Sequence, residues 1–314
     1  MPVIKVYHHG MTAAIPPKSN NHERAKRGIV KGWSKSATRN NTRWLRSVSP
    51  ESFSNDDEEF GLAFTLTIRD CPESSSDWHV LRTNFIKRVR RMGMLRLHWV
   101  TEWQRRGVPH LHGIIFFPLN HRKAIPAGLE RNIKESWIEV STAYGSSWKA
   151  QHTKIVTDVK GWFKYLSKHA SRGADHYQRS SSGIPSGWIK TGRVWGHCGD
   201  WITMDAVPIH ASNELFFAFR RIVRRWRLSD ARRAFRDAPM FFIERGYWVT
   251  NPEWLSAKRR ITSSRRILKC NDFKKSQVRG LSEWIDSETT LLIFEFLVSQ
   301  GYEIYISEEE EDRL

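Results

Sequence analysis

Two histidines and a glutamate stand close together in one stretch of the chain, and these residue types can hold a metal ion. His110 and His112 are separated by one residue, and Glu102 lies eight residues upstream. Apolar and β-favouring residues flank a basic interruption that contains Gly107, a pattern that predicts a β-hairpin over residues 95–117. Alternate side chains of a strand project to the same face, so the two imidazoles should meet.

The turn of this hairpin decides whether the carboxylate joins the imidazoles. A three-residue loop ending at Gly107, in the left-handed conformation, pairs Gln104 with Val108. Glu102 then lies opposite His110. Two neutral imidazoles and one carboxylate suit a divalent cation of the magnesium, manganese or zinc group. The alternative is an amphipathic hairpin whose histidines lie on its solvent-facing side, but the matching register of the glutamate favours a metal site.

A tyrosine and a lysine form a second candidate. Tyr165 and Lys168 fall within residues 161–172, whose pattern predicts a helix, so they share a face and His169 lies close to it. The pKa of a free phenol is near 10, and a neighbouring positive charge or metal favours the nucleophilic phenolate. The alternative is an interfacial tyrosine beside a solvated lysine, and this pair taken alone favours that alternative.

The elements that must position these residues predict an α+β fold. Ser34 is placed to cap a short basic helix. The order β, α, β, β, α, β that follows predicts an antiparallel sheet with helices mostly on one face. Its expected members are a strand over 64–68, a helix capped by Asp77 and ended by Gly93, the hairpin, a helix over 127–143 and a strand over 154–159.

The composition of the chain indicates a polyanionic partner. Its 314 residues include 51 Lys and Arg against 33 Asp and Glu, a net charge of +18. Basic residues interleaved with 15 Trp and 16 Phe are typical of single-stranded nucleic acid binding. Three scattered cysteines, the lack of an apolar signal core and the lack of a membrane span predict a cytoplasmic protein. No phosphate-loop motif is present, which argues against a built-in P-loop ATPase.

Three segments, in their order along the chain, resemble the three motifs of HUH endonucleases. They are Phe64-Thr65-Leu66-Thr67, Glu102 with His110-Leu111-His112, and Tyr165-Leu166-Ser167-Lys168. More narrowly, the chain resembles rolling-circle replication initiators of single-stranded DNA phages and small plasmids, over about residues 34–205. The resemblance implies a sheet of the ferredoxin-like or RRM-like split βαβ kind.

The resemblance also implies a role for each matching residue. His110, His112 and Glu102 would hold Mg²⁺ or Mn²⁺, Tyr165 would be the nucleophile, and Lys168 would help to position the metal or the scissile phosphate. Gly and His stand one helical turn to either side of the tyrosine, so the chain resembles the single-tyrosine type. Tyr177 is a further hydroxyl, for which a substrate-binding or core position is favoured.

The activity that the resemblance implies is the nicking and joining of single-stranded DNA at an origin. It would leave a 5′-phosphotyrosine adduct and a free 3′-hydroxyl in the cytoplasm of a bacterial host, with a host helicase and polymerase as partners and no membrane or small-molecule substrate. Alternatives are an HUH transposase or relaxase, a non-catalytic DNA-binding regulator or packaging protein, and a metal-dependent hydrolase that uses water.

We divide the chain into four predicted regions: a flexible basic N-terminal arm over residues 1–31, the HUH nuclease domain over 32–205, a basic, mainly helical DNA-binding region over 206–306 and an acidic tail over 307–314. Between Arg220 and Lys275 there are 17 Lys and Arg against five Asp and Glu. Arginines alternate there with aromatic residues in a helical pattern, which favours a phosphate-binding face over a merely solvated one.

Overall fold

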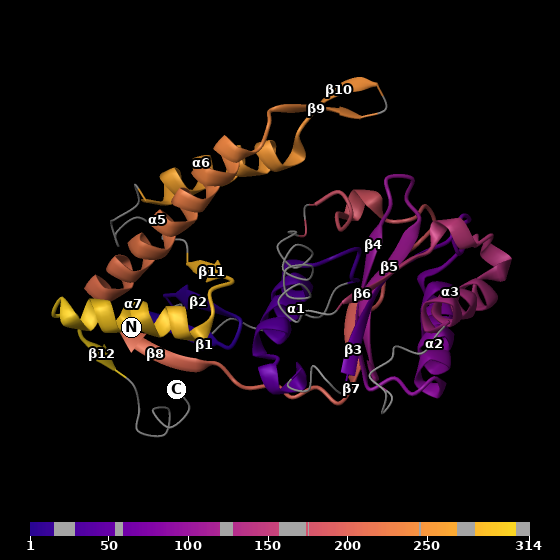
Figure 1. Cartoon of the computed structure of the whole chain (residues 1–314), viewed down its shortest axis with the longest axis horizontal. Coiled ribbons are helices and arrows are strands. Elements are labelled where there is room, and N and C mark those ends of the chain that lie inside the picture. Colours follow the sequence, from indigo (N-terminus) through magenta and orange to yellow (C-terminus); the bar gives the residue numbers. More distant parts are fainter. Residues whose placement is uncertain are drawn as a thin grey trace. The chain divides into compact units, whose positions relative to one another are not determined.

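The computed structural model describes residues 1–15, 29–53, 59–119, 128–156, 174, 176–244, 246–268 and 280–305. The chain divides into two compact units. A central unit runs from Glu23 to Met204, and a terminal unit combines Met1–His22 with Asp205–Leu314. Figure 1 shows both, coloured from indigo at the N-terminus to yellow at the C-terminus.

The central unit contains a five-stranded antiparallel sheet in the order β6-β3-β5-β4-β7 (Figure 1). The predicted α+β class and antiparallel sheet are therefore confirmed. Strands β3, β4, β5 and β6 lie where the sequence predicts strands, although β3 ends one residue before Ile68 and residues 157–159 of the last predicted strand lie outside the described residues. The strands are β3 (Glu59–Thr67), β4 (Arg96–Trp103), β5 (Pro109–Pro118), β6 (His152–Val156) and β7 (Trp195–Gly199).

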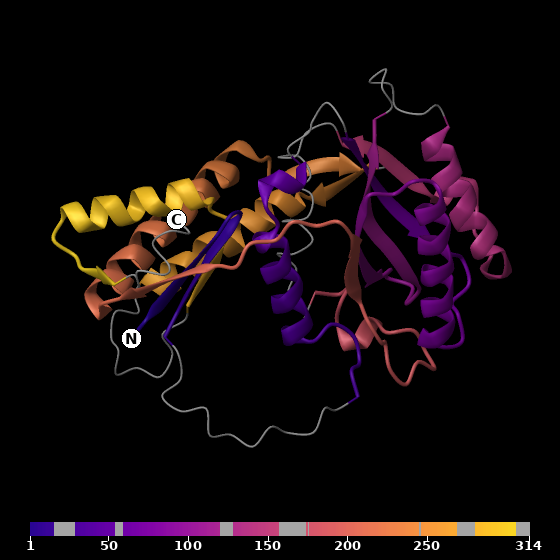
Figure 2. The same ribbon diagram turned by 90° about the horizontal axis from the view of Figure 1, so that it is seen from below.

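Two helices, α2 (Ser75–Arg91) and α3 (Leu129–Val140), cover one face of this sheet (Figure 2). The ring of Trp137 on α3 meets the rings of Trp78 and Phe85 on α2 edge to face, each with centroids 5.6 Å apart. Helix α2 begins one turn earlier than expected. Ser74 is its cap and the predicted cap, Asp77, completes a capping box from the third helical position.

Helix α1 (Lys35–Ser47) lies on the opposite face of the sheet (Figure 2). It begins where predicted, with the hydroxyl of Ser34 accepting a hydrogen bond from the backbone N–H of Ala37 at 2.9 Å. The expectation that helices lie mostly on one face therefore holds for α2 and α3 but not for α1. Short 3₁₀ helices complete the unit: η1 (Pro50–Phe53), η2 (Thr142–Tyr144), η3 (Trp148–Ala150) and η4 (Ser181–Gly183).

The terminal unit contains a second five-stranded sheet, in the order β11-β2-β1-β8-β12. Its core includes Ile4, Met11, Ile209, Phe216 and Phe219, all of them buried. The strands are β1 (Val3–Tyr7), β2 (Gly10–Ala14), β8 (Val207–Ala211), β11 (Leu281–Glu283) and β12 (Ile304–Tyr305), and the helices that pack with them are α5 (Asn213–Asp237) and α7 (Ser287–Ser299).

This sheet corrects the prediction of a flexible N-terminal arm. Residues 3–14 form a hairpin, and β1 also pairs with β8, whose residues are about two hundred positions away along the chain. The composition of residues 11 to about 30 predicts a segment that folds poorly alone, but Gly10–Ala14 form β2. Local composition does not reveal a partner strand so distant in sequence. The acidic tail over 307–314 lies outside the described residues.

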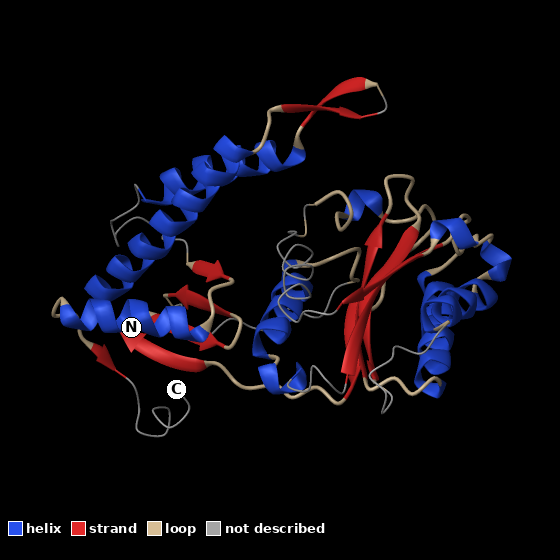
Figure 3. Ribbon diagram, in the orientation of Figure 1, coloured by secondary structure: helices blue, strands red, loops and turns tan. Residues whose placement is uncertain are grey.

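The remaining elements of the terminal unit are α6 (Pro252–Leu268), which packs along α5, and a two-stranded ribbon of β9 (Phe241–Glu244) and β10 (Tyr247–Thr250) (Figure 3). The predicted mainly helical C-terminal region thus contains three long helices and several strands in its described part. Throughout the residues that the structure describes, every helix is too short or too polar to cross a bilayer.

Candidate metal centre

The hairpin of β4 and β5 has the predicted turn and register. Gly107 adopts the left-handed conformation with a φ of 75°. The backbone N–H of Gln104 donates to the carbonyl of Val108 at 2.9 Å, which closes the three-residue loop. Glu102 pairs with His110 across the two strands, so the sequence-based register is confirmed.

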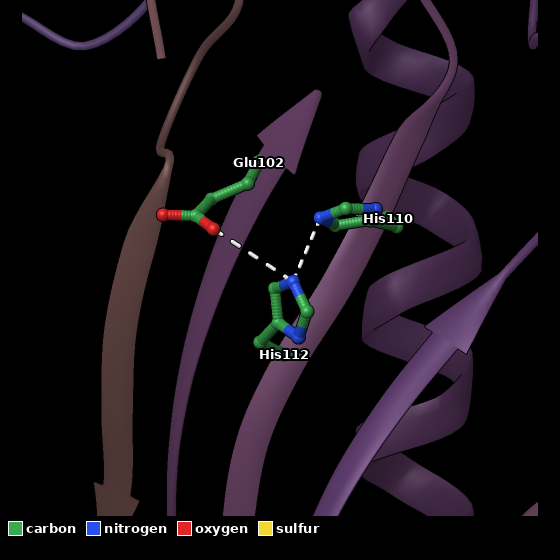
Figure 4. A group of neighbouring side chains, drawn as sticks. All are labelled: Glu102, His110 and His112. Atoms are coloured by element: carbon green, nitrogen blue, oxygen red, sulfur yellow. Dashed lines mark hydrogen bonds and ion pairs between the residues drawn. The ribbon is translucent and has the colours of Figure 1, made fainter. Parts of the chain in front are cut away.

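The three predicted ligands come together at the end of this hairpin. One side-chain donor atom from each of Glu102, His110 and His112 lies within 4.8 Å of the others. The two imidazole Nε2 atoms are 2.7 Å apart, and Figure 4 shows them facing each other with the carboxylate directed at His112. Glu102 is 0% exposed and the histidines 5% and 8%, so the alternative of histidines on a solvent-facing side is wrong.

A threonine of the neighbouring strand orients one of the imidazoles. Thr65 lies opposite His112 in the pairing of β3 with β5, and its Oγ1 is 2.8 Å from His112 Nδ1. If Nδ1–H donates this hydrogen bond, the Nε2 lone pair of His112 is left pointing toward His110 and Glu102. Thr65 belongs to the first motif of the sequence, to which no individual role was assigned there.

A buried arginine holds the carboxylate. Arg179 Nε donates to Glu102 Oε1 at 2.7 Å, and both side chains are 0% exposed. The other oxygen, Oε2, lies 3.7 Å from His112 Nε2. The guanidinium also stacks 4.0 Å from the ring centroid of Trp33. Arg179 therefore neutralises the carboxylate and leaves a single oxygen facing the imidazoles.

The donor set fits a divalent cation. Two imidazole nitrogens and one carboxylate oxygen converge in a buried place, as they would around a common ion. These three groups would leave further coordination positions for water or substrate oxygens. Such a set suits several divalent cations, because a carboxylate and water are ligands of Mg²⁺ and Mn²⁺, whereas two imidazoles and a carboxylate with an open position are also found around catalytic zinc.

The predicted nucleophile and its companion cannot be placed, because Tyr165 and Lys168 lie outside the described residues. Tyr177 is described and is half-exposed, with the guanidinium of Arg105 lying 5.5 Å from its ring centroid. Since Arg105 belongs to the turn between β4 and β5, Tyr177 lies beside that turn and not in the core.

Three other groups of the central unit lack the activation that a nucleophile requires. Burial raises the pKa of the Cys71 thiol to about 11 and also raises that of Cys198. Burial, together with the charges of Asp77 and Glu73, raises the pKa of the Tyr144 phenol. At neutral pH these groups therefore stay protonated and are weak nucleophiles.

Sequence reasoning missed Thr65 and Arg179 as parts of the centre. Thr65 could have been found once the pairing of β3 with β5 was known, because it aligns with His112. Arg179 has no comparable signal, since 77 residues separate it from Glu102 and its segment follows no strand or helix pattern.

Comparisons with known proteins agree with one another. The profile of the family described as "Replication-associated protein ORF2/G2P" matches residues 61–174, which include the hairpin. A protein of Xylella fastidiosa (strain 9a5c) that is named as a replication protein is 40% identical over 314 residues, covering 97% of this chain and 99% of the relative. The "Replication-associated protein G2P" of Pseudomonas phage Pf3 is 39% identical over 306 residues, covering 96% and 99%.

No solved structure matches the chain significantly. The two relatives nevertheless align over nearly their whole lengths and over both units of this chain, at an identity that establishes common descent. The chain therefore belongs to the replication-associated protein family ORF2/G2P.

Proposed function

We propose that this protein initiates rolling-circle replication by nicking and joining single-stranded DNA at an origin. The observation that carries the proposal is the buried convergence of Glu102, His110 and His112 on one hairpin, in a chain whose family is replication-associated. The resemblance to HUH endonucleases supplies the nucleophile, Tyr165.

The protein's own residues supply most of this chemistry. Tyr165 loses its phenolic proton and its oxygen attacks the phosphorus, forming a phosphotyrosine bond as the bond from phosphorus to the 3′ oxygen breaks. The departing 3′ oxygen takes up a proton, and Lys168 positions the scissile phosphate. Mg²⁺ or Mn²⁺, held by Glu102, His110 and His112, would polarise the phosphodiester and offset its developing charge.

The covalent adduct explains how one centre both cuts and joins. The phosphotyrosine bond conserves the energy of the phosphodiester, so attack by a 3′-hydroxyl on the adduct reseals a strand without ATP. The 3′-hydroxyl made in the first step is a primer for a host polymerase, and a host helicase would separate the strands ahead of it. We place this reaction in the cytoplasm of a bacterial host, with origin DNA as substrate.

A denaturing gel tests the proposal. The full-length protein is incubated with labelled single-stranded oligonucleotides that tile its replicon, with and without Mn²⁺. Wild type is compared with Tyr165→Phe and with Tyr177→Phe as a matched loss of one hydroxyl. We expect one oligonucleotide to yield a labelled band that migrates with the protein, depends on metal, is absent for Tyr165→Phe and persists for Tyr177→Phe.

Other outcomes identify the alternatives. Metal-dependent cleavage without an adduct would make water the nucleophile and remove Tyr165 from its role. Tight binding of every oligonucleotide with no cleavage would leave a DNA-binding regulator or packaging protein. The location of the cut separates the remaining members of the superfamily, because a transposase cuts a transposon end and a relaxase cuts a transfer origin.

A further inference from the structure

The ribbon of β9 and β10 exposes large apolar side chains to solvent. Ile243, Tyr247 and Trp248 are 61%, 76% and 74% exposed. Trp248 pairs with Ile243 and Tyr247 with Glu244, and neighbouring positions of a strand point to opposite faces. The ribbon therefore presents an aromatic ring on each of its two faces, and exposed apolar side chains gathered on one short element are typical of an interaction site.

The ribbon has a firm support. Helices α5 and α6 pack against each other, and each has a fully buried alanine, Ala231 on α5 and Ala257 on α6. Near the ribbon, the rings of Phe235 and Trp254 lie with centroids 4.8 Å apart. Figure 3 shows the ribbon extending beyond the ends of these two helices. Its aromatic rings are thus held away from the core of the terminal unit.

The supporting helices are strongly basic. Residues 213–268 contain fourteen Arg and Lys against five Asp and Glu. Arg220 and Arg224 are buried, and Arg224 forms a salt bridge with Glu283, so these predicted phosphate contacts instead belong to the packing of the unit. Among the described side chains of these helices, the exposed basic ones are Arg225, Arg232, Arg233, Arg236, Lys258, Arg259 and Arg265.

We propose that the ribbon binds unpaired bases of single-stranded DNA. Trp248 and Tyr247 stack on the bases while the exposed arginines of α5, such as Arg232 and Arg233, hold the phosphates. Flat apolar rings beside cations match the two chemistries that a single strand offers, a base face and a phosphate. In a duplex the base faces are already stacked on one another.

A second copy of this chain fits the ribbon less well. Docking two ribbons would bring two helical supports of the same positive charge toward each other, and like charges oppose such an association. A DNA strand carries the opposite charge. The inference rests on the proposed function in one respect, that single-stranded DNA is the substrate of this protein. It does not depend on the chemistry at Tyr165.

Binding measurements with the full-length protein test the ribbon. Fluorescence anisotropy follows a labelled oligothymidylate of about 20 nucleotides and a blunt duplex of equal length, at several salt concentrations. Wild type is compared with the double variant Y247A/W248A. The control is Phe296→Ala, which removes an exposed aromatic ring from α7 of the same unit. Circular dichroism checks that each variant is folded.

We expect Y247A/W248A to bind the oligothymidylate about 30- to 100-fold more weakly, because each of the two stacked bases contributes about five- to tenfold at the lower end of the range for such stacking. The slope of log Kd against log salt should stay unchanged, since no phosphate contact is lost. Affinity for the blunt duplex and the behaviour of Phe296→Ala should match those of wild type.

Three results would overturn the inference. If Y247A/W248A binds the single strand as tightly as wild type does, the two rings do not bind its bases. If the variant loses affinity for the duplex to the same extent, the ribbon does not recognise unpaired bases. Wild-type self-association in sedimentation velocity that Y247A/W248A abolishes, with DNA binding intact, would make the ribbon an interface between copies. Measuring nicking by the same proteins separates base binding by the ribbon from the proposed nicking activity. An origin strand that is bound through the ribbon but never cut would contradict only the proposed function.

Discussion

The carboxylate of Glu102 is fully buried, and the buried guanidinium of Arg179 stabilises its charge there. A carboxylate without solvent contact is costly unless it is paired and hydrogen-bonded. Arg179 supplies both the charge and the bond, with Nε 2.7 Å from Oε1. The same contact fixes which oxygen faces His112. Arg179 is thus a positioning residue for the candidate metal centre.

Replacing Arg179 by methionine keeps much of its apolar surface but removes its charge. We expect Arg179→Met to lower the free energy of unfolding by about 3–5 kcal/mol, because the buried carboxylate loses its partner. Adding Glu102→Gln should restore at least half of that loss, since a neutral amide needs no counter-charge. Urea unfolding followed by circular dichroism measures both changes.

A surface ion pair provides the control for these stability measurements. Arg88 pairs with Glu139 at an exposed position of the same unit, so Arg88→Met should cost less than about 1 kcal/mol. If the double variant proves no more stable than Arg179→Met alone, the loss comes from packing around Trp33 and not from the unpaired charge.

At the scale of elements, local patterns in the sequence predict the hairpin well and its surroundings poorly. Alternating residues and one glycine at the turn determine β4, β5 and the position of Glu102 opposite His110. Strand β7 gives no such signal, because it has only five residues and two of them are glycine. The contacts of Thr65 and Arg179 depend on how distant segments pair, which local periodicity does not contain.

Helix α1 is held to the sheet by stacked rings that include two histidines. The ring of Trp44 lies nearly parallel to those of His98 and His197, with centroid distances of 5.2 and 4.1 Å. Burial, and then the charge of Arg193, lowers the pKa of His197. The folded protein therefore favours the neutral imidazole, whereas the unfolded chain takes up a proton near the ordinary pKa of 6.5.

It follows that acid should weaken this attachment. The neutral imidazole of His197 stabilises the fold at a pH above 6.5, the pKa of histidine in the unfolded chain. This stabilisation is lost as the pH falls below that value, so the urea midpoint of wild type should drop between about pH 7.5 and about pH 5. His197→Phe keeps a ring for Trp44 but cannot be protonated, and we expect a smaller drop. Circular dichroism at both pH values checks this, and equal drops in the two proteins would show that His197 is not responsible.

At the scale of the whole molecule, the terminal unit is built from both ends of the chain. Strand β1 lies between β2 and β8, so the terminal unit is complete only when the first residues pair with those that follow the central unit. Sequence reasoning described the N-terminus by its composition and so assigned it no fold. The pairing of β1 with β8 joins residues on either side of the entire central unit, which makes it a strongly non-local contact.

A cavity in β1 should therefore weaken the terminal unit selectively. Ile4 is 0% exposed in the core of that unit, and Ile4→Ala should cost about 2–5 kcal/mol. Lys5→Ala, the exposed neighbour on the same strand, should change stability by less than about 0.5 kcal/mol. Hydrogen exchange with mass spectrometry on the full-length protein should find protection reduced in β8, α5 and α7 and retained in β3, β4 and β5. Equal loss in both units would mean that they unfold together, and no loss in either would mean that the N-terminal hairpin contributes little to the sheet that it completes.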